Sequence, residues 1–517
     1  MSLIGKFASV SGATMVSRVL GFVREALIGA ALGAGPVADA FYAAFRFPNL
    51  FRRIFAEGAF NTAFIPLFAK SLEGGGMEEA RKFAENVLSV LIAALLFLSA
   101  LAMIAMPFLV ATVIAPLFAD TPEKFDLTVL MTRIMFPYLF CMSLVAMMSG
   151  ILNSLHRYFL AAIVTAALNV IMIGVLLAAL MSEVEPRTTG LWLAWGVCAS
   201  GFAQLGMLIW GVRREGFTMR LTRPAFTPQI KRLLVLMGPA VLTGGVTQIN
   251  LLVGQIIASA QDGAIALLNY ADRLNQLPLG VIGIAVGVVL LPELSRALKA
   301  RHMVEAQHLQ NRSLEFAVAL TLPAAVGLMV MPAPLINIVY ERGAFTPETT
   351  RLAAAALAAF AAGLPAFVLV KVFSPAYFAR EDMRTPLYVS IVAVVANIAF
   401  SLLLFGRYGH VAIAIATSVS GWINAVALAV ILWMRNQYRI SPATVRRLVL
   451  TILCSALLAG FLYGAQVWLA PQFSSTSLLI RLATVIAVIA VSMAGYFALA
   501  WTSGALDREL FRKTMKR

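Results

Sequence analysis

The chain has 517 residues, of which 61% are hydrophobic and 12% are charged, and its mean hydropathy is +0.88. Soluble globular proteins carry roughly 25% charged residues, so this composition leaves too little polar surface to cover a water-soluble fold. The formal net charge of +16 is compatible with a nucleic-acid partner until the positions of the charges are considered.

Apolar runs of about 20 residues recur along the whole chain, and each can cross a hydrocarbon core of roughly 30 Å. In lipid such runs form helices, because every backbone N–H and C=O needs a partner within its own segment. The first run passes through Arg18 and Arg24 without a small-residue cleavage site, which favours a retained helix over a signal peptide. We expect an all-α polytopic membrane protein with about fourteen spans, at 14–33, 38–62, 84–106, 128–152, 158–181, 190–212, 233–259, 265–295, 313–337, 350–375, 385–405, 410–433, 447–469 and 480–502.

The basic residues predict the orientation of these spans. If both termini are cytoplasmic, 26 of the 40 Lys and Arg residues lie in cytoplasmic segments and seven lie in outside segments. The positive-inside rule therefore predicts that both termini lie in the cytoplasm. The basic charge reflects topology, and we expect no nucleic-acid partner.

A weak internal repeat predicts two lobes. Residues 46–50, followed by Pro66, resemble residues 273–277, followed by Pro292, at an offset of about 227 residues. An even number of spans separates the copies, so a pseudo-twofold axis along the membrane normal would relate the halves. The predicted domains are a six-helix N-lobe at 1–212, a basic cytoplasmic linker at 213–232, a six-helix C-lobe at 233–435, and two C-terminal helices with a basic tail at 436–517.

Besides these 33 basic residues, seven cations remain, and they fall inside the predicted spans. A charge at a helix centre costs about 2.5–3.5 kcal/mol on insertion scales, so several of them require a water-filled cavity or buried partners. The acids in the same helices are fewer, namely Glu25, Asp39, Glu57 and Asp272. The seven cations are Arg18, Arg24, Arg46, Arg52, Arg53, Arg273 and Lys371.

The sequence separation between cations and acids distinguishes structural ion pairs from charges that remain available to a ligand. Arg53 and Glu57 are four residues apart and would lie on one helical face as a pair. The members of the adjacent pairs 24–25 and 272–273 are expected to point in different directions, so their charges do not simply cancel. We therefore expect a set of arginines from the first, second and eighth spans to converge on a cavity between the lobes. Planar guanidinium groups suit a phosphate or diphosphate.

Other features favour transport over catalysis. Three predicted spans are interrupted by prolines, Pro48, Pro278 and Pro365. A proline frees a backbone carbonyl from its helical hydrogen bond, and transporters tolerate this where the freed group faces a cavity or another helix. The histidines lack nucleophile or metal-ligand spacing, so we expect no enzyme activity, metal or cofactor. The three cysteines, Cys141, Cys198 and Cys454, lie in apolar runs and are expected to be small buried hydrophobic residues.

Several motifs resemble those of the MurJ (MviN) family of bacterial lipid II flippases. Residues 17–25 read SRVLGFVRE and residues 45–53 read FRFPNLFRR. Residues 38–41, 57–60, 270–274 and 290–292 also resemble the family. The resemblance covers essentially the whole chain and is most specific in its first sixty residues.

This resemblance implies a fourteen-helix fold of the multidrug/oligosaccharidyl-lipid/polysaccharide exporter superfamily in the bacterial inner membrane. It implies that lipid II, the undecaprenyl-diphosphate-linked disaccharide pentapeptide, is turned from the cytoplasmic to the periplasmic leaflet for peptidoglycan synthesis. In the family, a groove for the polyprenyl tail is associated with the last two helices. The positions that match the family's diphosphate-binding arginines are Arg18, Arg24, Arg52 and Arg273. The positions expected at the cavity or its gate are Asp39, Arg46, Arg53, Glu57 and Asp272.

The sequence is compatible with more than one driving force for transport and more than one set of partners. The sodium site of some family members needs acidic ligands, and the corresponding spans offer amides such as Gln248, Asn250, Asn397 and Asn424 but no acid. An inside-negative membrane potential is the alternative driving force, at about 2.3 kcal/mol per charge per 100 mV. We expect a monomer with lipid II and membrane lipids as partners, within or outside a cell-wall synthesis complex.

Three other functions fit the sequence less well. A drug/cation antiporter of the same superfamily would need cavity carboxylates, whereas arginines outnumber acids here. A polysaccharide-lipid flippase would share the basic cavity and differ in the N-terminal motif. A polyprenyl-phosphate transferase would show clustered Asp or His residues with magnesium-binding spacing, which the sequence lacks.

Overall fold

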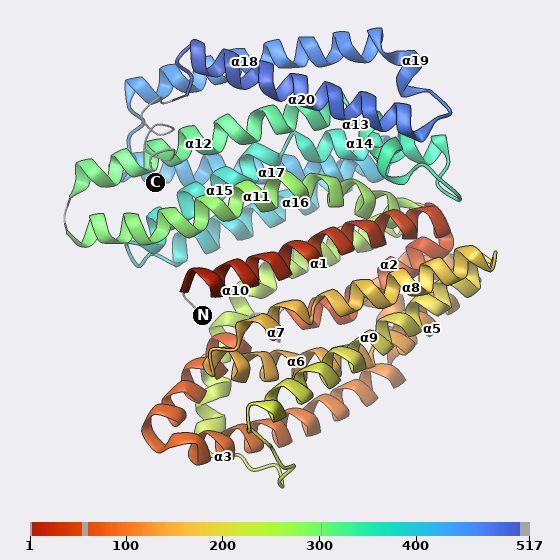
Figure 1. Ribbon diagram of the computed structural model, residues 1–517, viewed down its shortest axis with the longest axis vertical. Helices are drawn as coiled ribbons and strands as arrows, with labels where there is room; N and C mark the ends of the chain where they lie inside the picture. Colours follow the sequence, from red (N-terminus) through yellow and green to blue (C-terminus); the bar gives the residue numbers. More distant parts are fainter. Residues whose placement is uncertain (1–2, 54–59, 301, 507–517) are drawn as a thin grey trace. The chain divides into compact units, whose positions relative to one another are not determined.

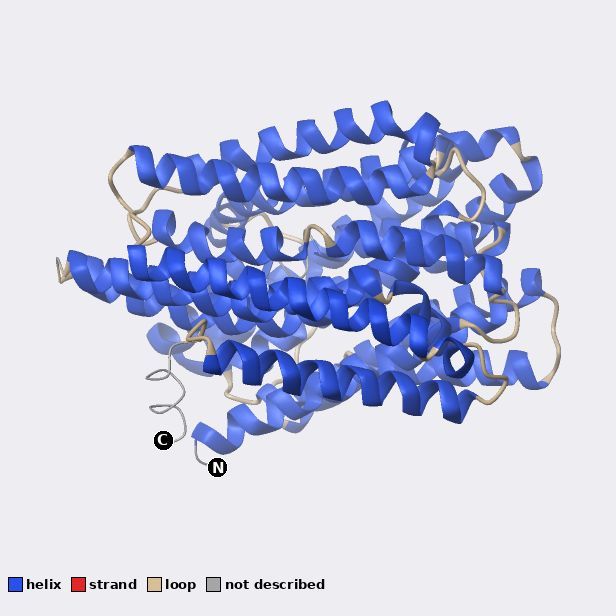
Figure 2. Cartoon of the chain, turned by 90° about the horizontal axis from the view of Figure 1, so that it is seen from above, coloured by secondary structure: helices blue, strands red, loops and turns tan. Residues whose placement is uncertain are grey.

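The computed structural model describes residues 3–53, 60–300 and 302–506. Within these residues the chain is helical and contains no strand (Figure 2). Cys141, Cys198 and Cys454 are buried and free, as predicted. The predicted all-α class is confirmed.

In the part of the chain that the structure describes, ten helical stretches are long and apolar enough to cross a membrane. They begin with Asn61–Ile104 and end with Leu478–Thr502. The predicted spans at 14–33, 38–62 and 265–295, which carry all of the predicted intramembrane charges except Lys371, are not among the ten, and neither is 233–259. The protein is a multi-pass membrane protein, and the number fourteen stays a prediction.

The first compact unit comprises residues 1–266 and 342–345. Short breaks at Phe136 and at residues 164–165 divide two of its predicted spans into consecutive helices. A π-helical turn at Val110–Ile114 and a 3₁₀ turn at Pro116–Asp120 lead into α5. Its helices are α1 (Leu3–Leu32), α2 (Pro36–Phe51), α3 (Asn61–Ile104), α4 (Met106–Leu109), α5 (Pro122–Met135), α6 (Pro137–Ser154), α7 (Tyr158–Ile163), α8 (Ala166–Met181), α9 (Pro186–Arg214) and α10 (Pro228–Ala258).

The second compact unit comprises residues 267–341 and 346–517, and α11 begins just before it. Pro278 lies inside α11, whereas Pro365 lies at the start of α15, after Gly363 has separated that helix from α14. The helices are α11 (Ala264–Lys299), α12 (Met303–Val330), α13 (Pro332–Tyr340), α14 (Pro347–Ala361), α15 (Leu364–Phe378), α16 (Arg384–Tyr408), α17 (His410–Met434), α18 (Pro442–Trp468), α19 (Ala470–Phe473) and α20 (Leu478–Thr502). The predicted lobe boundaries stay a prediction.

The extended segment between α9 and α10 lies along α3. The Arg220 amide donates to the Glu85 carboxylate at 2.9 Å, and the Thr222 amide donates to Ser89 Oγ at 3.0 Å. Phe217 is fully buried, with its ring centroid 5.7 Å from that of Phe68. Part of the predicted basic linker is therefore fixed to the first unit by backbone donors and one aromatic anchor.

The last two long helices pack side by side within the second unit (Figure 1). Buried Glu315 on α12 accepts from the Thr444 hydroxyl at 2.6 Å and pairs with Arg447 at 2.8 Å, which fixes the start of α18. Tyr496 on α20 donates to the Ala319 carbonyl at 2.8 Å. Because each contact satisfies a polar group that would otherwise face hydrocarbon, α18 and α20 are held to α12 in defined positions.

Asp382 closes the base of the α16–α17 hairpin. Its carboxylate accepts from the Thr385 amide at 3.0 Å and the Thr385 hydroxyl at 2.6 Å, and it pairs with Arg435 at 2.8 Å. The Thr385 hydrogen bonds and then Arg435 lower the pKa of Asp382 to about 2, because each stabilises the ionised carboxylate.

We expect Asp382→Ala to destabilise the protein by ~1 kcal/mol at neutral pH, as for other lost helix caps. Because the folded-state pKa lies below the usual value, the stabilisation is present above about pH 4 and is lost as the pH falls towards 2. The measurement is the melting temperature of the purified protein in detergent across that range. Glu73→Ala, at an exposed position, is the control, and a difference between the variants that persists at low pH would contradict this account.

Candidate functional site

The cations of α1 differ in their surroundings. Arg18 is exposed and has no ion-pair or hydrogen-bond partner among the described residues. Arg24 is buried, donates to Asn169 Oδ1 at 2.9 Å and pairs with Glu25 at 2.5 Å. The expectation that residues 24 and 25 point apart is wrong, because the long Arg24 side chain folds back onto its neighbour. Tyr42 donates to the second Glu25 oxygen at 2.7 Å, so α1, α2 and α8 share one buried polar network.

The cations of α2 and the residues after it lie close together in sequence. Arg46 and Arg52 are half-buried, and Arg53 is exposed. Arg52 Nε donates to Asn49 Oδ1 at 2.8 Å, one turn earlier. Glu57, the predicted gate residue and partner of Arg53, lies outside the described residues.

Two predicted site residues, Asp272 and Arg273, and the intramembrane cation Lys371 belong to the second unit. Asp272 and Arg273 are half-buried on α11, and Gln276 donates to the Asp272 carboxylate. Lys371 is half-buried on α15 and has no ion-pair partner among the described residues. The convergence of Arg273 with the arginines of the first unit stays a prediction.

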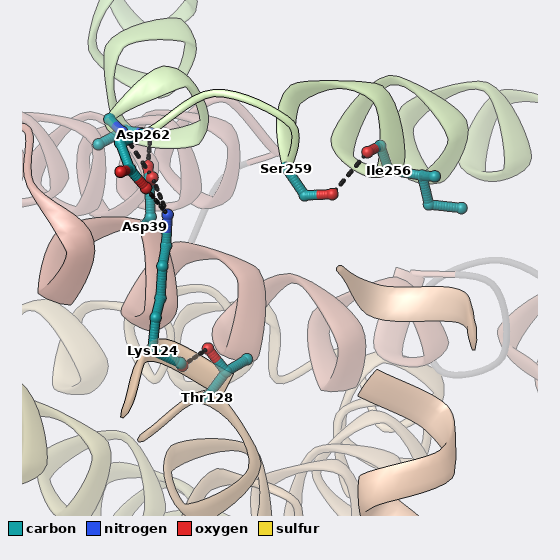
Figure 3. Close-up of polar contacts among 8 residues, drawn as sticks. Asp39, Lys124, Thr128, Ile256, Ser259 and Asp262 are labelled. Atoms are coloured by element: carbon teal, nitrogen blue, oxygen red, sulfur yellow. Dashed lines mark hydrogen bonds and ion pairs between the residues drawn. The ribbon is translucent and has the colours of Figure 1, made fainter. Parts of the chain in front are cut away.

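Asp39 lies in an ion-pair cluster that the sequence did not indicate, in which Asp39 and Lys124 are buried and Asp262 is exposed (Figure 3). Its carboxylate has no exposed surface and accepts from Lys124 Nζ at 2.9 Å. Lys124 also contacts Asp262 at 2.8 Å, and its ammonium lies 4.0 Å from the centre of the Phe118 ring. We call Asp39, Lys124 and Asp262 the Lys124 cluster.

The same carboxylate caps a helix far away in the sequence. Asp39 accepts from the amides of Gly263 at 2.7 Å and Ala266 at 3.0 Å, at the first turn of α11. A negative charge at a helix N-terminus satisfies amides that lack an intrahelical partner. The cluster therefore joins α2, α5 and the α10–α11 turn. A sequence can suggest that an aspartate in an apolar helix has a partner, but it cannot identify a lysine 85 positions away.

Three glycines with positive φ, Gly33, Gly263 and Gly343, bring backbone segments together near this cluster. A Cβ at Gly33 would lie 2.5 Å from the Ala344 carbonyl oxygen, and one at Gly263 would lie 2.7 Å from the Ala34 oxygen. The Ala344 amide donates to the Ala30 carbonyl at 2.8 Å. This glycine junction excludes side chains, so this end of the first unit is closed by backbone contact.

The second unit carries a small apolar pocket between α18 and α20. Its volume is about 230 Å³. The walls include Leu457 and Phe461 from α18 and Val491 and Leu499 from α20. A pocket of this composition holds hydrocarbon and offers few hydrogen bonds to a polar group.

No group of three or more potential metal ligands is present in the described residues. The site chemistry is that of cations embedded in apolar helices. Such an arrangement favours an anionic ligand over a cationic one.

The fold is that of a polytopic transporter. The solved structure described as "Lipid II flippase MurJ, inward closed conformation" aligns with a TM-score of 0.76 and 24% identity, over 98% of this chain and 99% of that one. An inward-facing multidrug resistance MATE family transporter of the MOP superfamily aligns with a TM-score of 0.66 and 16% identity, over 83% and 98%. At these identities the likenesses define the fold class.

Sequence comparison identifies the family. The family model described as "Lipid II flippase MurJ" matches residues 28–484. A probable lipid II flippase MurJ from Rhizobium tropici is 50% identical over all of this chain and 97% of the relative. The lipid II flippase MurJ of Burkholderia cenocepacia is 33% identical over 98% of each chain. The chain belongs to the MurJ family of lipid II flippases, as the motifs predicted.

The Lys124 cluster provides a test of how this end of the first unit is held. Lys124→Met leaves the Asp39 carboxylate buried without a counter-charge, so we expect a loss of about 3–5 kcal/mol. The double variant Asp39→Asn/Lys124→Met removes both charges and is expected to recover part of this loss. The measurement is unfolding of the purified protein in mixed micelles.

Lys82→Met serves as the matched control, because Lys82 pairs with Glu78 on an exposed helix surface. Little change is expected there. Equal stability of Lys124→Met and Lys82→Met, or no recovery in the double variant, would show that the buried pair does not stabilise this end.

Proposed function

We propose that this protein moves lipid II from the cytoplasmic to the periplasmic leaflet of the bacterial inner membrane, by alternating access and without covalent chemistry. The observation that carries the proposal is the exposed Arg18 on α1, which has no partner among the described residues, together with the half-buried Arg52 after α2. Cations in apolar helices require an anionic partner or a water-filled cavity. Membership of the MurJ family supplies the identity of that partner.

The diphosphate is the part of lipid II that these arginines suit. A guanidinium stays charged and presents two parallel donors to a phosphate. Arg18, Arg52 and Arg273 are proposed as direct contacts. Arg24 is already bound by Glu25 and Asn169, so its proposed role is to bind the diphosphate in competition with these partners.

The Lys124 cluster and the glycine junction are proposed as the periplasmic closure. Residues 34–37, 124 and 262 all fall in segments that the positive-inside analysis assigns to the outside. That agreement supports cytoplasmic termini. In this proposal Asp39 holds the gate closed rather than contacting substrate.

The apolar pocket between α18 and α20 is proposed to receive part of the polyprenyl chain. Its lining is hydrocarbon, and the Glu315 and Tyr496 contacts fix both helices to α12. With no acid in the spans that would hold sodium, an inside-negative potential is the proposed driving force, because it favours outward movement of the anionic headgroup. The protein is proposed to act as a monomer.

The test is complementation in a bacterium depleted of its own lipid II flippase. We expect Arg18→Ala, Arg52→Ala and Arg273→Ala to be made at normal levels and to fail to prevent lysis, with lipid II retained in the inner leaflet. Loss of one charge-assisted hydrogen bond to phosphate weakens binding by roughly tenfold or more. The measurements are growth and the leaflet location of lipid II.

Arg351→Ala is the control, because Arg351 forms an exposed pair with Glu348 in the first turn of α14. It is expected to complement fully. If all three site variants also restored growth and lipid II export, the arginines would be structural and the assignment of the site would fail. If wild type itself failed although it was present in the membrane, the proposed substrate would be wrong.

A further inference from the structure

The first unit contains an apolar pocket of about 790 Å³ that the proposed transport cycle does not use. One wall is a face of α3, where residues 91, 94, 95, 98, 101, 102 and 105 follow helical spacing. The opposite walls come from α2, α6 and the start of α10, with Phe51, Leu139 and Met237 among their residues. All of these residues belong to the first unit.

The pocket contains almost no hydrogen-bonding capacity. Among the described residues of its lining, Ser143 has the one polar side chain, and its hydroxyl donates to the Leu139 carbonyl of its own helix at 2.9 Å. Leu98, Leu101 and Phe108 line the pocket and remain more than half exposed, at 55%, 54% and 66%. Because α3 is a membrane-spanning helix, this side of the pocket opens towards the acyl chains of the bilayer.

A cation lies beside the pocket. Arg133 Nε donates to the Met103 carbonyl at 3.0 Å, and Met103 lies between the lining residues Ala102 and Ala105. Arg133 also precedes the lining residue Phe136 by one helical turn. The guanidinium is half-buried, and among the described residues its terminal nitrogens have no acceptor and no carboxylate partner. Such a group is stabilised by water or by an anion from outside the chain, and the adjoining apolar pocket favours an anion that carries a hydrocarbon chain.

From this juxtaposition we propose that the pocket is a binding site for an anionic membrane phospholipid, with one acyl chain along α3 and the phosphate at Arg133. The lining from Leu91 to Ala105 extends over roughly 21 Å at 1.5 Å per residue, which accommodates a chain that reaches about half of a 30 Å core. The phosphate accepts from the terminal guanidinium nitrogens while Nε continues to hold α3.

The volume of about 790 Å³ favours a single chain over a transmembrane helix as the occupant. Part of the undecaprenyl chain of the proposed substrate is the other candidate of this chemistry, and competition between the two lipids separates them. A pocket within the range of roughly 300–1,000 Å³ holds a single compact ligand or chain.

The experiment uses the full protein in vesicles of phosphatidylethanolamine and phosphatidylglycerol, with a diazirine at the acyl end of a fraction of the phosphatidylglycerol. After irradiation, labelled peptides are mapped by mass spectrometry. We expect label on residues 91–105. Ala102→Phe fills the pocket and should reduce this label about tenfold, whereas Ala100→Phe, two residues away on the exposed face of α3, should not.

Ala94→Phe and Ala93→Phe form a second matched pair on the same helix, in case Ala102→Phe is not stably made. Arg133→Gln should lower labelling by phosphatidylglycerol roughly tenfold and leave labelling by diazirine phosphatidylcholine unchanged.

Label that persists in both filled variants overturns the site. Equal labelling by both lipids in wild type overturns the role of Arg133. Displacement of the label by undecaprenyl phosphate but not by excess unlabelled phosphatidylglycerol assigns the pocket to the substrate chain and overturns the proposal.

Discussion

Every charged group in this protein that lies at membrane depth must find a partner or water, and this constraint organises the structure. The Lys124 cluster shows how the constraint is met inside the chain, because one buried lysine holds Asp39 while the same carboxylate caps the first turn of α11. Glu315 does the same for α18 through Thr444 and Arg447. In each case a polar group that hydrocarbon would penalise becomes a fixed point between helices.

Where the chain does not supply a partner, the same constraint identifies where a ligand belongs. Arg18 and Arg133 both lie in helices that cross or approach the membrane, and neither has a carboxylate partner within the described residues. Arg18 belongs to the motif that the family shares, whereas Arg133 lies beside an apolar pocket. One constraint therefore supports two different anionic ligands, a transported diphosphate and a resident phospholipid.

The all-α class and the family could be predicted from sequence, because hydrophobic length and the motifs at 17–25 and 45–53 are local properties. The site could be predicted only in part. The presence of cations in apolar runs is a local fact, but their partners are set by tertiary packing. Adjacent positions on a helix predict that Arg24 points away from Glu25, whereas the two side chains form an ion pair. Asn169 and Tyr42 complete the network around this pair, and sequence spacing alone cannot reveal them.

A buried ion pair suits a closure that must also open. Its strength depends on the absence of water, and the side chains of Asp39 and Lys124 are 0% and 2% exposed. In the proposed cycle, separation of these segments admits water to both ions, and their recovered hydration offsets much of the lost attraction. If apolar side chains filled the same area, their exposure to water on opening would not be favourable, and no hydration would offset the lost contacts. In the proposed cycle, the Asp39–Lys124 pair therefore makes opening cost less free energy than apolar packing would, and its fixed geometry still defines the closed state.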